Sequence, residues 1–89
     1  MESYKILVIR FSSIGDIVLT TPIVRALKQQ LKNVEIHYLT KKTNYSLLQN
    51  NKYIDKIHLL EDADLLKKLR SNKFDYIVDL HNNLRTLKI

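Results

Sequence analysis

The chain has 89 residues, 45% of them hydrophobic and 27% charged, so it has room for one domain of ordinary globular composition. It contains no cysteine, which excludes disulfides, thiol nucleophiles and cysteine-based metal sites. The formal net charge is +6, and its basic residues are scattered among the acidic ones without a nucleic-acid motif. This charge suits an anionic substrate or anionic membrane headgroups equally and identifies no partner. Because no nucleic-acid motif is present, we expect no nucleic-acid partner.

The first predicted strand is Lys5–Phe11, which contains the unbroken apolar run Ile6–Ile9. This run is far too short to span a membrane, and no signal peptide is evident, so we expect a cytoplasmic protein. The residues Asp16–Leu31 carry apolar side chains four positions apart and predict a helix. Because proline is tolerated only in the first turn of a helix, Pro22 predicts a turn through Leu19 and a new helix start.

The rest of the chain continues the alternation of strands and helices. The predicted elements are a strand, a short helix, a strand, a helix, a strand and the start of another helix: Val34–Thr40, Asn44–Gln49, Lys56–Leu60, Asp62–Arg70, Asp75–Leu80 and Asn83–Ile89. This alternation predicts an α/β fold with a parallel sheet. The first and fourth strands are continuously apolar and suit the centre, whereas the third carries charge and imidazole and suits an edge. The predicted order is 3-2-1-4, a Rossmann-like half-sheet.

In this order the direction of winding reverses between the first and fourth strands. Ligands of open α/β sheets bind beyond the carboxyl ends of the strands at such a point. Two polar segments should meet there, Ser12–Asp16 after the first strand and Asp79–Arg85 after the fourth. Their convergence predicts the binding site.

The first of these segments combines hydroxyls, a glycine and a carboxylate. Ser12 and Ser13 stand beside the free backbone N–H groups of a helix start, which attract anions, and Gly15 allows a tight turn or the close approach of a ligand. Asp16 is a candidate general base for a substrate hydroxyl, although the helix start keeps it ionised and therefore weak. The structural alternative has equal weight: a serine caps the helix, Gly15 makes the turn and Asp16 complements the helix dipole.

The second segment offers several hydrogen-bonding groups. Asn82 and Asn83 suit sugar hydroxyls, His81 adds an imidazole, and Arg85 suits a carboxylate or phosphate in bidentate geometry. An asparagine-rich turn with Arg85 on a solvated face is the structural alternative. Four such groups at the switch point favour binding.

The remaining polar residues are interpreted as structural. His37 and His58 alternate with apolar neighbours on predicted strands. Glu61, Asp62 and Asp64 open a predicted helix, whose dipole they complement. No pair of residues has convincing metal-ligand spacing, and one glycine makes neither a dinucleotide nor a Walker A signature. The sequence therefore predicts no metal and no cofactor.

Two motifs carry a resemblance to a known family. The run from Lys5 to Leu27, centred on Phe-Ser-Ser-Ile-Gly-Asp, resembles the start of the lipopolysaccharide heptosyltransferases, glycosyltransferase family 9. Asp79–Arg85 resembles the second N-terminal signature of that family, and Asn51–Ile57 is also typical of it. The resemblance implies a GT-B enzyme with two Rossmann-like domains. Such an enzyme transfers heptose from ADP-heptose to the lipopolysaccharide inner core, with inversion and without a required metal.

The resemblance also implies roles for individual residues. Asp16 matches the presumed catalytic base, and the acceptor contacts would be Ser12, Ser13, Gly15, His81, Asn82, Asn83 and Arg85. In the family the N-terminal domain mainly holds the acceptor and the C-terminal domain holds most of the donor.

Family members are several times longer than this chain. We therefore expect residues 1–89 to form a partial, acceptor-side N-terminal domain, with the donor-binding C-terminal domain absent and the isolated chain inactive. The alternative is a non-catalytic module that binds a glycan, an anion or another copy of itself. The expected partners of the full-length enzyme are ADP-heptose and the lipopolysaccharide core, and peripheral contact with the inner membrane stays open. Since the fourth strand would keep an unpaired edge, we expect the fragment to form a homo-oligomer.

Overall fold

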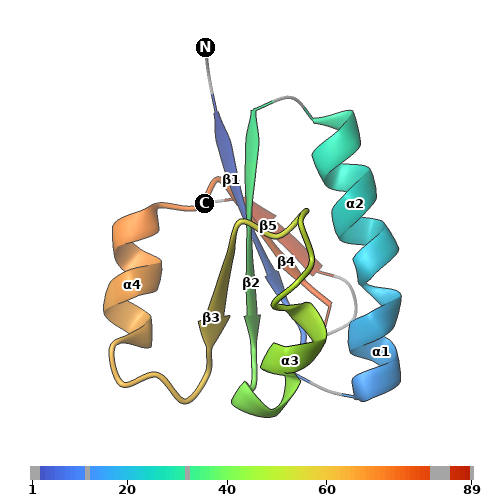
Figure 1. The fold of residues 1–89 in the computed structure, drawn as a ribbon. Coiled ribbons are helices and arrows are strands. Elements are labelled where there is room, and N and C mark those ends of the chain that lie inside the picture. Colours follow the sequence, from blue (N-terminus) through green and yellow to red (C-terminus); the bar gives the residue numbers. More distant parts are fainter. Residues whose placement is uncertain (1–2, 12, 32, 81–84, 89) are drawn as a thin grey trace.

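A computed structural model describes residues 3–11, 13–31, 33–80 and 85–88, the last four by their backbone alone. They form a five-stranded sheet of order β3-β2-β1-β4-β5 with helices on both faces (Figure 1). The strands are β1 Tyr4–Ile9, β2 Val34–Thr40, β3 Lys56–Leu59, β4 Tyr76–Asp79 and β5 Arg85–Lys88. The helices are α1 Ile14–Leu19, α2 Thr21–Gln30, the 3₁₀ turn η1 Lys42–Asn44, α3 Tyr45–Leu48 and α4 Leu65–Asn72.

The first four strands are parallel, which confirms the predicted fold class and the order 3-2-1-4. The central strand β1 pairs with β2 along one edge and with β4 along the other. Both of its faces are also covered, since Ile6 and Val8 belong to one apolar core and Leu7 to the other. The short β3 pairs only with β2 and forms one edge. Its charged Lys56 is exposed there, as expected of an edge strand.

The predicted helix at Asn83–Ile89 is wrong where the structure describes it. Arg85–Lys88 forms β5, which pairs antiparallel with β4. A helix of seven residues would be marginal in isolation, whereas the strand satisfies the backbone groups along the open edge of β4. The expected unpaired edge of the fourth strand is therefore also wrong. The unpaired edge of the fourth strand therefore no longer supports the expected homo-oligomer, which stays a prediction.

The long predicted helix is interrupted at Thr20, and α2 restarts with Pro22 in its first turn, as predicted. Thr20 Oγ1 donates to the Ile17 carbonyl at 2.6 Å, so the hydroxyl of Tyr38 must donate to Thr20 Oγ1 across 2.8 Å. Tyr38 is fully buried, and this burial raises the pKa of its hydroxyl. The hydrogen bond fastens the break between α1 and α2 to the middle of β2.

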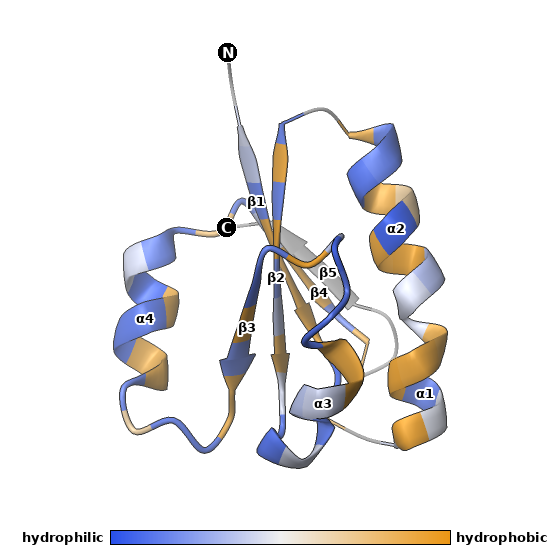
Figure 2. Ribbon diagram, in the orientation of Figure 1, coloured by the Kyte–Doolittle hydropathy of each residue, from blue (hydrophilic) through white to orange (hydrophobic). Residues whose placement is uncertain are grey.

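Alternate residues of each strand face opposite sides of the sheet and build two apolar cores. One core lies under α1, α2 and α3 and contains Ile6, Val8, Ile17, Val24, Ile36, Tyr38 and Leu48. The smaller one lies under α4 and contains Leu7, Leu39, Leu65 and Phe74. Figure 2 shows the hydrophobic central strands between these two layers of helices.

A candidate active site at the carboxyl ends of β1 and β4

The structure confirms that the two polar segments meet, for the part of the second segment that ends at Leu80. Ile9 at the end of β1 is in register with Asp79 at the end of β4. The next residue, Leu80, donates its N–H to the Ile9 carbonyl at 3.0 Å. Ser12, His81, Asn82 and Asn83 lie outside the described residues, and Arg85 is described only as a backbone position in β5.

Arg10 joins the two segments. Its Nη2 lies 2.8 Å from Asp16 Oδ2, and its Nη1 donates to the Leu80 carbonyl. Its backbone N–H donates to the Leu39 carbonyl at 3.2 Å, which places it at the end of β2 as well. Sequence reasoning missed Arg10. The available signal was a fixed positive charge placed directly after an unbroken apolar strand at the switch point.

Asp16 is an ionised carboxylate on the first turn of α1. Its Oδ2 accepts the Ser13 hydroxyl at 2.9 Å and the Ser13 backbone N–H at 3.4 Å, in addition to the Arg10 contact. The two Ser13 hydrogen bonds, followed by Arg10, hold the pKa of Asp16 below its usual value of 3.8. About half of the side chain is exposed, and the hydrogen bonds and the ion pair from Ser13 and Arg10 all reach Oδ2. Ser13 and Asp16 thus support the start of the helix, and these contacts engage one of the two carboxylate oxygens.

Gly15 does not make the turn. It lies inside α1 without a positive φ, so no backbone conformation there requires glycine. A Cβ built on Gly15 would meet no atom of the described residues within 4 Å. The turn interpretation is therefore wrong, and open space beside the Gly15 backbone is what remains for the close approach of a ligand.

A buried asparagine holds the loop that carries the site. Asn44 Nδ2 donates to the Phe11 carbonyl at 2.7 Å and to Thr40 Oγ1 at 3.1 Å. These bonds tie the end of β2 to the segment that leads from β1 to Ser13. No pattern in the sequence distinguishes Asn44 from an ordinary turn residue, so it was also missed.

A second polar cluster lies on the α4 face of the sheet and is buried. His37 Nδ1 lies 2.8 Å from His58 Nε2, and His37 Nε2 lies 2.6 Å from Glu35 Oε2. Phe74 packs edge-on against both rings. Burial, followed by the neighbouring His37, lowers the pKa of His58 to about 4. These contacts fit the structural interpretation of both histidines.

The acidic cluster before α4 also makes local contacts. Glu61 Oε1 accepts the Lys42 N–H at 2.8 Å, and Asp62 pairs with Lys68 at 2.6 Å. Within residues 3–11, 13–31, 33–80 and 85–88, no three His, Asp or Glu side chains come together in a way that could hold a metal ion. In the same part of the chain no helix is long and apolar enough to cross a membrane.

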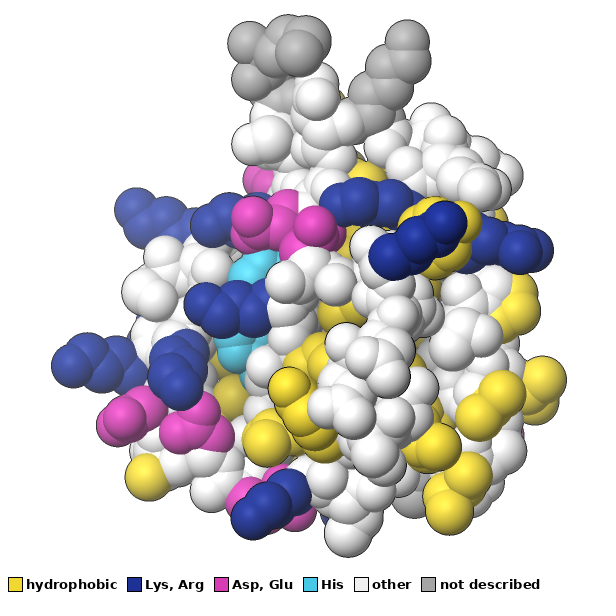
Figure 3. All heavy atoms as spheres, viewed as in Figure 1, with side chains coloured by type: hydrophobic (Ala, Val, Ile, Leu, Met, Phe, Trp, Pro, Cys, Tyr) yellow, Lys and Arg dark blue, Asp and Glu magenta, His cyan; other side chains and the backbone are white. Residues whose placement is uncertain are grey.

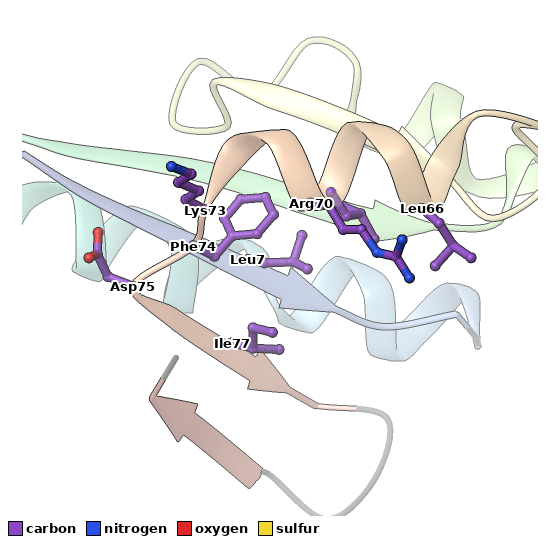
Figure 4. Close-up of a pocket in the computed structure, with 8 residues that line it drawn as sticks. Leu7, Leu66, Arg70, Lys73, Phe74, Asp75 and Ile77 are labelled. Carbon is purple, nitrogen blue, oxygen red and sulfur yellow. The ribbon is translucent and has the colours of Figure 1, made fainter.

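A groove of about 630 Å³ opens beside α4, on the face opposite α1 (Figure 4). It is lined mainly by apolar side chains, among them Leu7, Phe74 and Ile77, with Arg70 at its rim. None of the lining residues whose side chains the structure describes belongs to the two polar segments. The described lining of the groove is therefore separate from Ser13 and Asp16.

Comparisons with known proteins support the resemblance seen in the motifs. No family model matches the chain. It is 28% identical over 90 residues to lipopolysaccharide heptosyltransferase 1 of Campylobacter coli, and the match covers 92% of this chain and 26% of that protein. A crystal structure of the glycosyl transferase family 9 from Veillonella parvula DSM 2008 matches with a TM-score of 0.80 at 22% identity, over 93% of this chain and 28% of that one. The chain thus spans about a quarter of the length of each protein. It resembles a lipopolysaccharide heptosyltransferase in sequence and has the fold of part of a family 9 glycosyltransferase.

Proposed function

We propose that this chain is the acceptor-side part of a glycosyltransferase that moves heptose from ADP-heptose to the lipopolysaccharide inner core. The observation that carries the proposal is Asp16, a half-exposed, ionised carboxylate placed where the carboxyl ends of β1 and β4 meet. The similarity to a heptosyltransferase supports the choice of donor and acceptor. In this proposal the donor side belongs to a longer polypeptide with a second Rossmann-like domain.

The proposed reaction is a single displacement with inversion. An acceptor hydroxyl attacks the anomeric carbon of the heptose, the bond from that carbon to the diphosphate oxygen breaks, and ADP leaves. The proton of the hydroxyl passes to Asp16 Oδ1, since the hydrogen bonds of Ser13 and the ion pair with Arg10 engage Oδ2. Because its pKa is low, Asp16 first orients the hydroxyl and accepts the proton late, once the new bond has made the hydroxyl acidic.

The neighbours of Asp16 have positioning roles in this proposal. Ser13 and Arg10 hold Oδ2 and thereby fix the orientation of the carboxylate, with Oδ1 proposed to meet the acceptor. The open space at Gly15 leaves room for the acceptor sugar beside the backbone. Ser12, His81, Asn82, Asn83 and Arg85 remain proposed acceptor contacts.

The test is a chimera in which residues 1–89 replace the matching segment of the Campylobacter coli protein. Release of ADP from ADP-heptose is measured with a heptose-free lipopolysaccharide acceptor. Asp16→Asn should lower turnover by about 10²–10⁴-fold, as expected for the loss of a positioned base. Donor affinity should hardly change, because the donor is proposed to lie on the other domain.

The matched control is Asp62→Asn. Asp62 is also partly exposed, is also paired with a cation and also has a lowered pKa, but it follows the edge strand β3. This variant should keep the parental turnover. If both variants keep it, Asp16 is a helix-start residue and the proposed base is wrong. The 89-residue chain alone should release no ADP, since the donor side is proposed to lie elsewhere.

A further inference from the structure

A small polar hollow lies between α2 and the segment that joins α3 to β3. Its volume is about 210 Å³, and its described lining residues are Thr21, Pro22, Arg25, Asn51 and Tyr53. This volume is below the roughly 300–1,000 Å³ of sites for drug-sized ligands, so the hollow suits a phosphate group or a single sugar. None of these five residues belongs to the two polar segments, so the hollow is distinct from Ser13 and Asp16.

The charge beside this hollow is positive. The charged residues of α2 are Arg25 and Lys28, and Lys28 is paired with Asp55 at 2.6 Å. Arg25 is exposed, and its side chain makes no hydrogen bond or ion pair with the described residues. Lys52 Nζ lies 5.2 Å from the centre of the Tyr53 ring and adds a second positive charge. Figure 3 shows Lys and Arg side chains on the side of the molecule where α2 lies. Since no carboxylate is among the described lining residues, the hollow favours an anion.

The neutral groups of the hollow are hydrogen-bond donors. Asn51 Oδ1 accepts the Tyr53 backbone N–H at 2.9 Å, so the amide keeps its Nδ2 group for a ligand. Neither this Nδ2 nor the Tyr53 hydroxyl has a hydrogen-bond partner among the described residues. The Thr21 hydroxyl already donates to the Val18 carbonyl at 2.8 Å. Guanidinium, amide and phenol together suit a ligand with several acceptor oxygens and a negative charge, which is the chemistry of a phosphate group.

Both walls of the hollow rest on the larger apolar core. Val24 in the wall formed by α2 is fully buried, and Tyr53 and Ile54 in the opposite wall pack against the same core. The Asn51 N–H donates to the Leu48 carbonyl at 3.0 Å, and the Ile54 N–H donates to the Asn51 carbonyl at 3.1 Å. The donors are therefore held in place before a ligand arrives, which lowers the entropy cost of binding.

We propose that this hollow binds a phosphate group, either free or carried by a small sugar. Arg25 pairs with two phosphate oxygens through its planar guanidinium. Asn51 Nδ2 and the Tyr53 hydroxyl donate to the remaining oxygen and to a neighbouring sugar hydroxyl. The inference goes beyond the proposed function, since it requires neither a donor nor an acceptor at Asp16.

The test is a titration of the 89-residue chain with glucose 6-phosphate, followed by the NMR signals of Arg25 Nε–H and the Asn51 side-chain amide. Both signals should shift and saturate together. Inorganic phosphate should shift the same two signals, and glucose should shift neither. Equal affinities for inorganic phosphate and glucose 6-phosphate would identify free phosphate as the ligand. Tighter binding of glucose 6-phosphate would show that the sugar is recognised as well.

Three variants test the individual donors. Asn51→Asp keeps Oδ1 for the Tyr53 N–H but replaces Nδ2 with a charged oxygen, so phosphate binding should weaken at least tenfold. Arg25→Gln removes a charge-assisted pair and should weaken binding about tenfold or more. Tyr53→Phe removes one neutral hydrogen bond and keeps the ring, so binding should weaken about two- to tenfold.

The chain offers a matched control in Arg70, which is also exposed but lies on α4 at the rim of the apolar groove. Arg70→Gln lowers the net charge by the same amount as Arg25→Gln and should keep the parental affinity. Circular dichroism should show that all four variants are folded. The inference is overturned if the parent shows no saturating shift, if Arg70→Gln weakens binding as much as Arg25→Gln, or if Asn51→Asp binds as tightly as the parent. The assay measures no turnover, so its outcome is independent of the proposed base.

Discussion

Two polar clusters join neighbouring strands of this sheet, and they differ in burial. Arg10, Asp16 and the Leu80 carbonyl lie at the carboxyl ends of β1 and β4, where about half of the Asp16 side chain is exposed. Glu35, His37 and His58 lie along β2 and β3 under α4, where both imidazoles are buried. The Arg10–Asp16 and His37–His58 contacts are both 2.8 Å long, and the His37–Glu35 contact is 2.6 Å long. Contact distance alone therefore does not separate a site from a structural cluster.

The causes of the pKa shifts do separate them. The pKa of Asp16 is lowered by hydrogen bonds from Ser13 and by the charge of Arg10, so its charged form is favoured. The pKa of His58 is lowered mainly by burial, so its neutral form is favoured. The pKa is lowered in both clusters, but for different reasons. In one it indicates a solvated carboxylate, Asp16, that is available for a ligand, and in the other a desolvated neutral ring, His58. This difference can be tested through the free energy of unfolding, through its dependence on pH and through direct titration of Asp16.

The largest expected effect is on the buried cluster. Phe74 is buried and packs edge-on against both imidazoles, so Phe74→Ala should lower the free energy of unfolding by about 3–5 kcal/mol. Domains of this size are stable by only about 5–15 kcal/mol in total. Urea unfolding followed by circular dichroism measures the change. Leu66→Ala on exposed α4 surface is the control, with an expected change within about 0.5 kcal/mol. A loss no larger than that of Leu66→Ala would show that the buried cluster does not hold the fold together.

The second effect is a dependence of stability on pH. His58 has a usual pKa of 6.5 and a folded pKa of about 4, so the unfolded chain binds its proton first as the pH falls. The free energy of unfolding is therefore highest above pH 6.5 and falls toward pH 4. Lys56, Lys68 and His37 favour the neutral ring, and Asp62 opposes them. Between about pH 6.5 and 5 the loss should reach about 1.5 kcal/mol.

Glu35 does not interfere in this window. Its folded pKa lies below the usual 4.5, so its contribution to stability is lost only as the pH falls further. The measurement is the urea midpoint at several pH values, with His58→Phe as the variant that removes the titrating ring. A parental slope that survives in His58→Phe would assign the pH dependence to another group.

The framework of the fold could be predicted from the sequence because its strands differ in apolar content. The continuous run Ile6–Ile9 marked β1 as central, and charge with imidazole in Lys56–Leu59 marked β3 as an edge. Pro22 marked the break between α1 and α2 through its fixed backbone geometry. The strand Arg85–Lys88 could not be predicted this way, because it forms through pairing with β4 and its own pattern is weak.

The candidate site was predictable in position and less so in detail. Topology placed Ser13 and Asp16 next to the end of β4, which the structure confirms up to Leu80. Arg10 and Asn44 were missed because their contacts join segments far apart in the chain, Arg10 to Leu80 and Asn44 to Phe11. Periodicity describes neighbours along one element and contains no information about such contacts.

The smallest expected effect is a change in the pKa of Asp16 in the exposed cluster, and it is measured by titration. Ser13→Ala and Arg10→Gln should each raise the pKa of Asp16 toward 3.8, since each removes a group that stabilises the carboxylate. The measurement is the carboxyl ¹³C chemical shift of Asp16 against pH in the 89-residue chain. Added salt at about 0.5 M should weaken the attraction of Arg10 and leave the short-range bonds of Ser13 largely intact. The remaining shift should therefore depend on salt in Ser13→Ala and be nearly independent of salt in Arg10→Gln.

Ser71→Ala is the control for this titration, because its hydroxyl donates to the Lys68 carbonyl on α4 and is not among the groups that shift the pKa of Asp16. Ser13→Ala removes the N-cap side chain of α1 and should lower the free energy of unfolding by about 0.5–2 kcal/mol. Loss of the partly exposed Arg10–Asp16 ion pair should by itself change this free energy only slightly, because exposed ion pairs contribute little to folding. Both changes are smaller than the one expected for Phe74→Ala, so this cluster contributes less to the fold than the buried one and its half-exposed carboxylate stays available for a ligand. The contrary result is that Asp16 titrates at its usual pKa of 3.8 in the parent, with no change of this pKa in either variant. That result would show that Ser13 and Arg10 do not stabilise the carboxylate, and it would contradict the proposed difference between this cluster and the buried histidines.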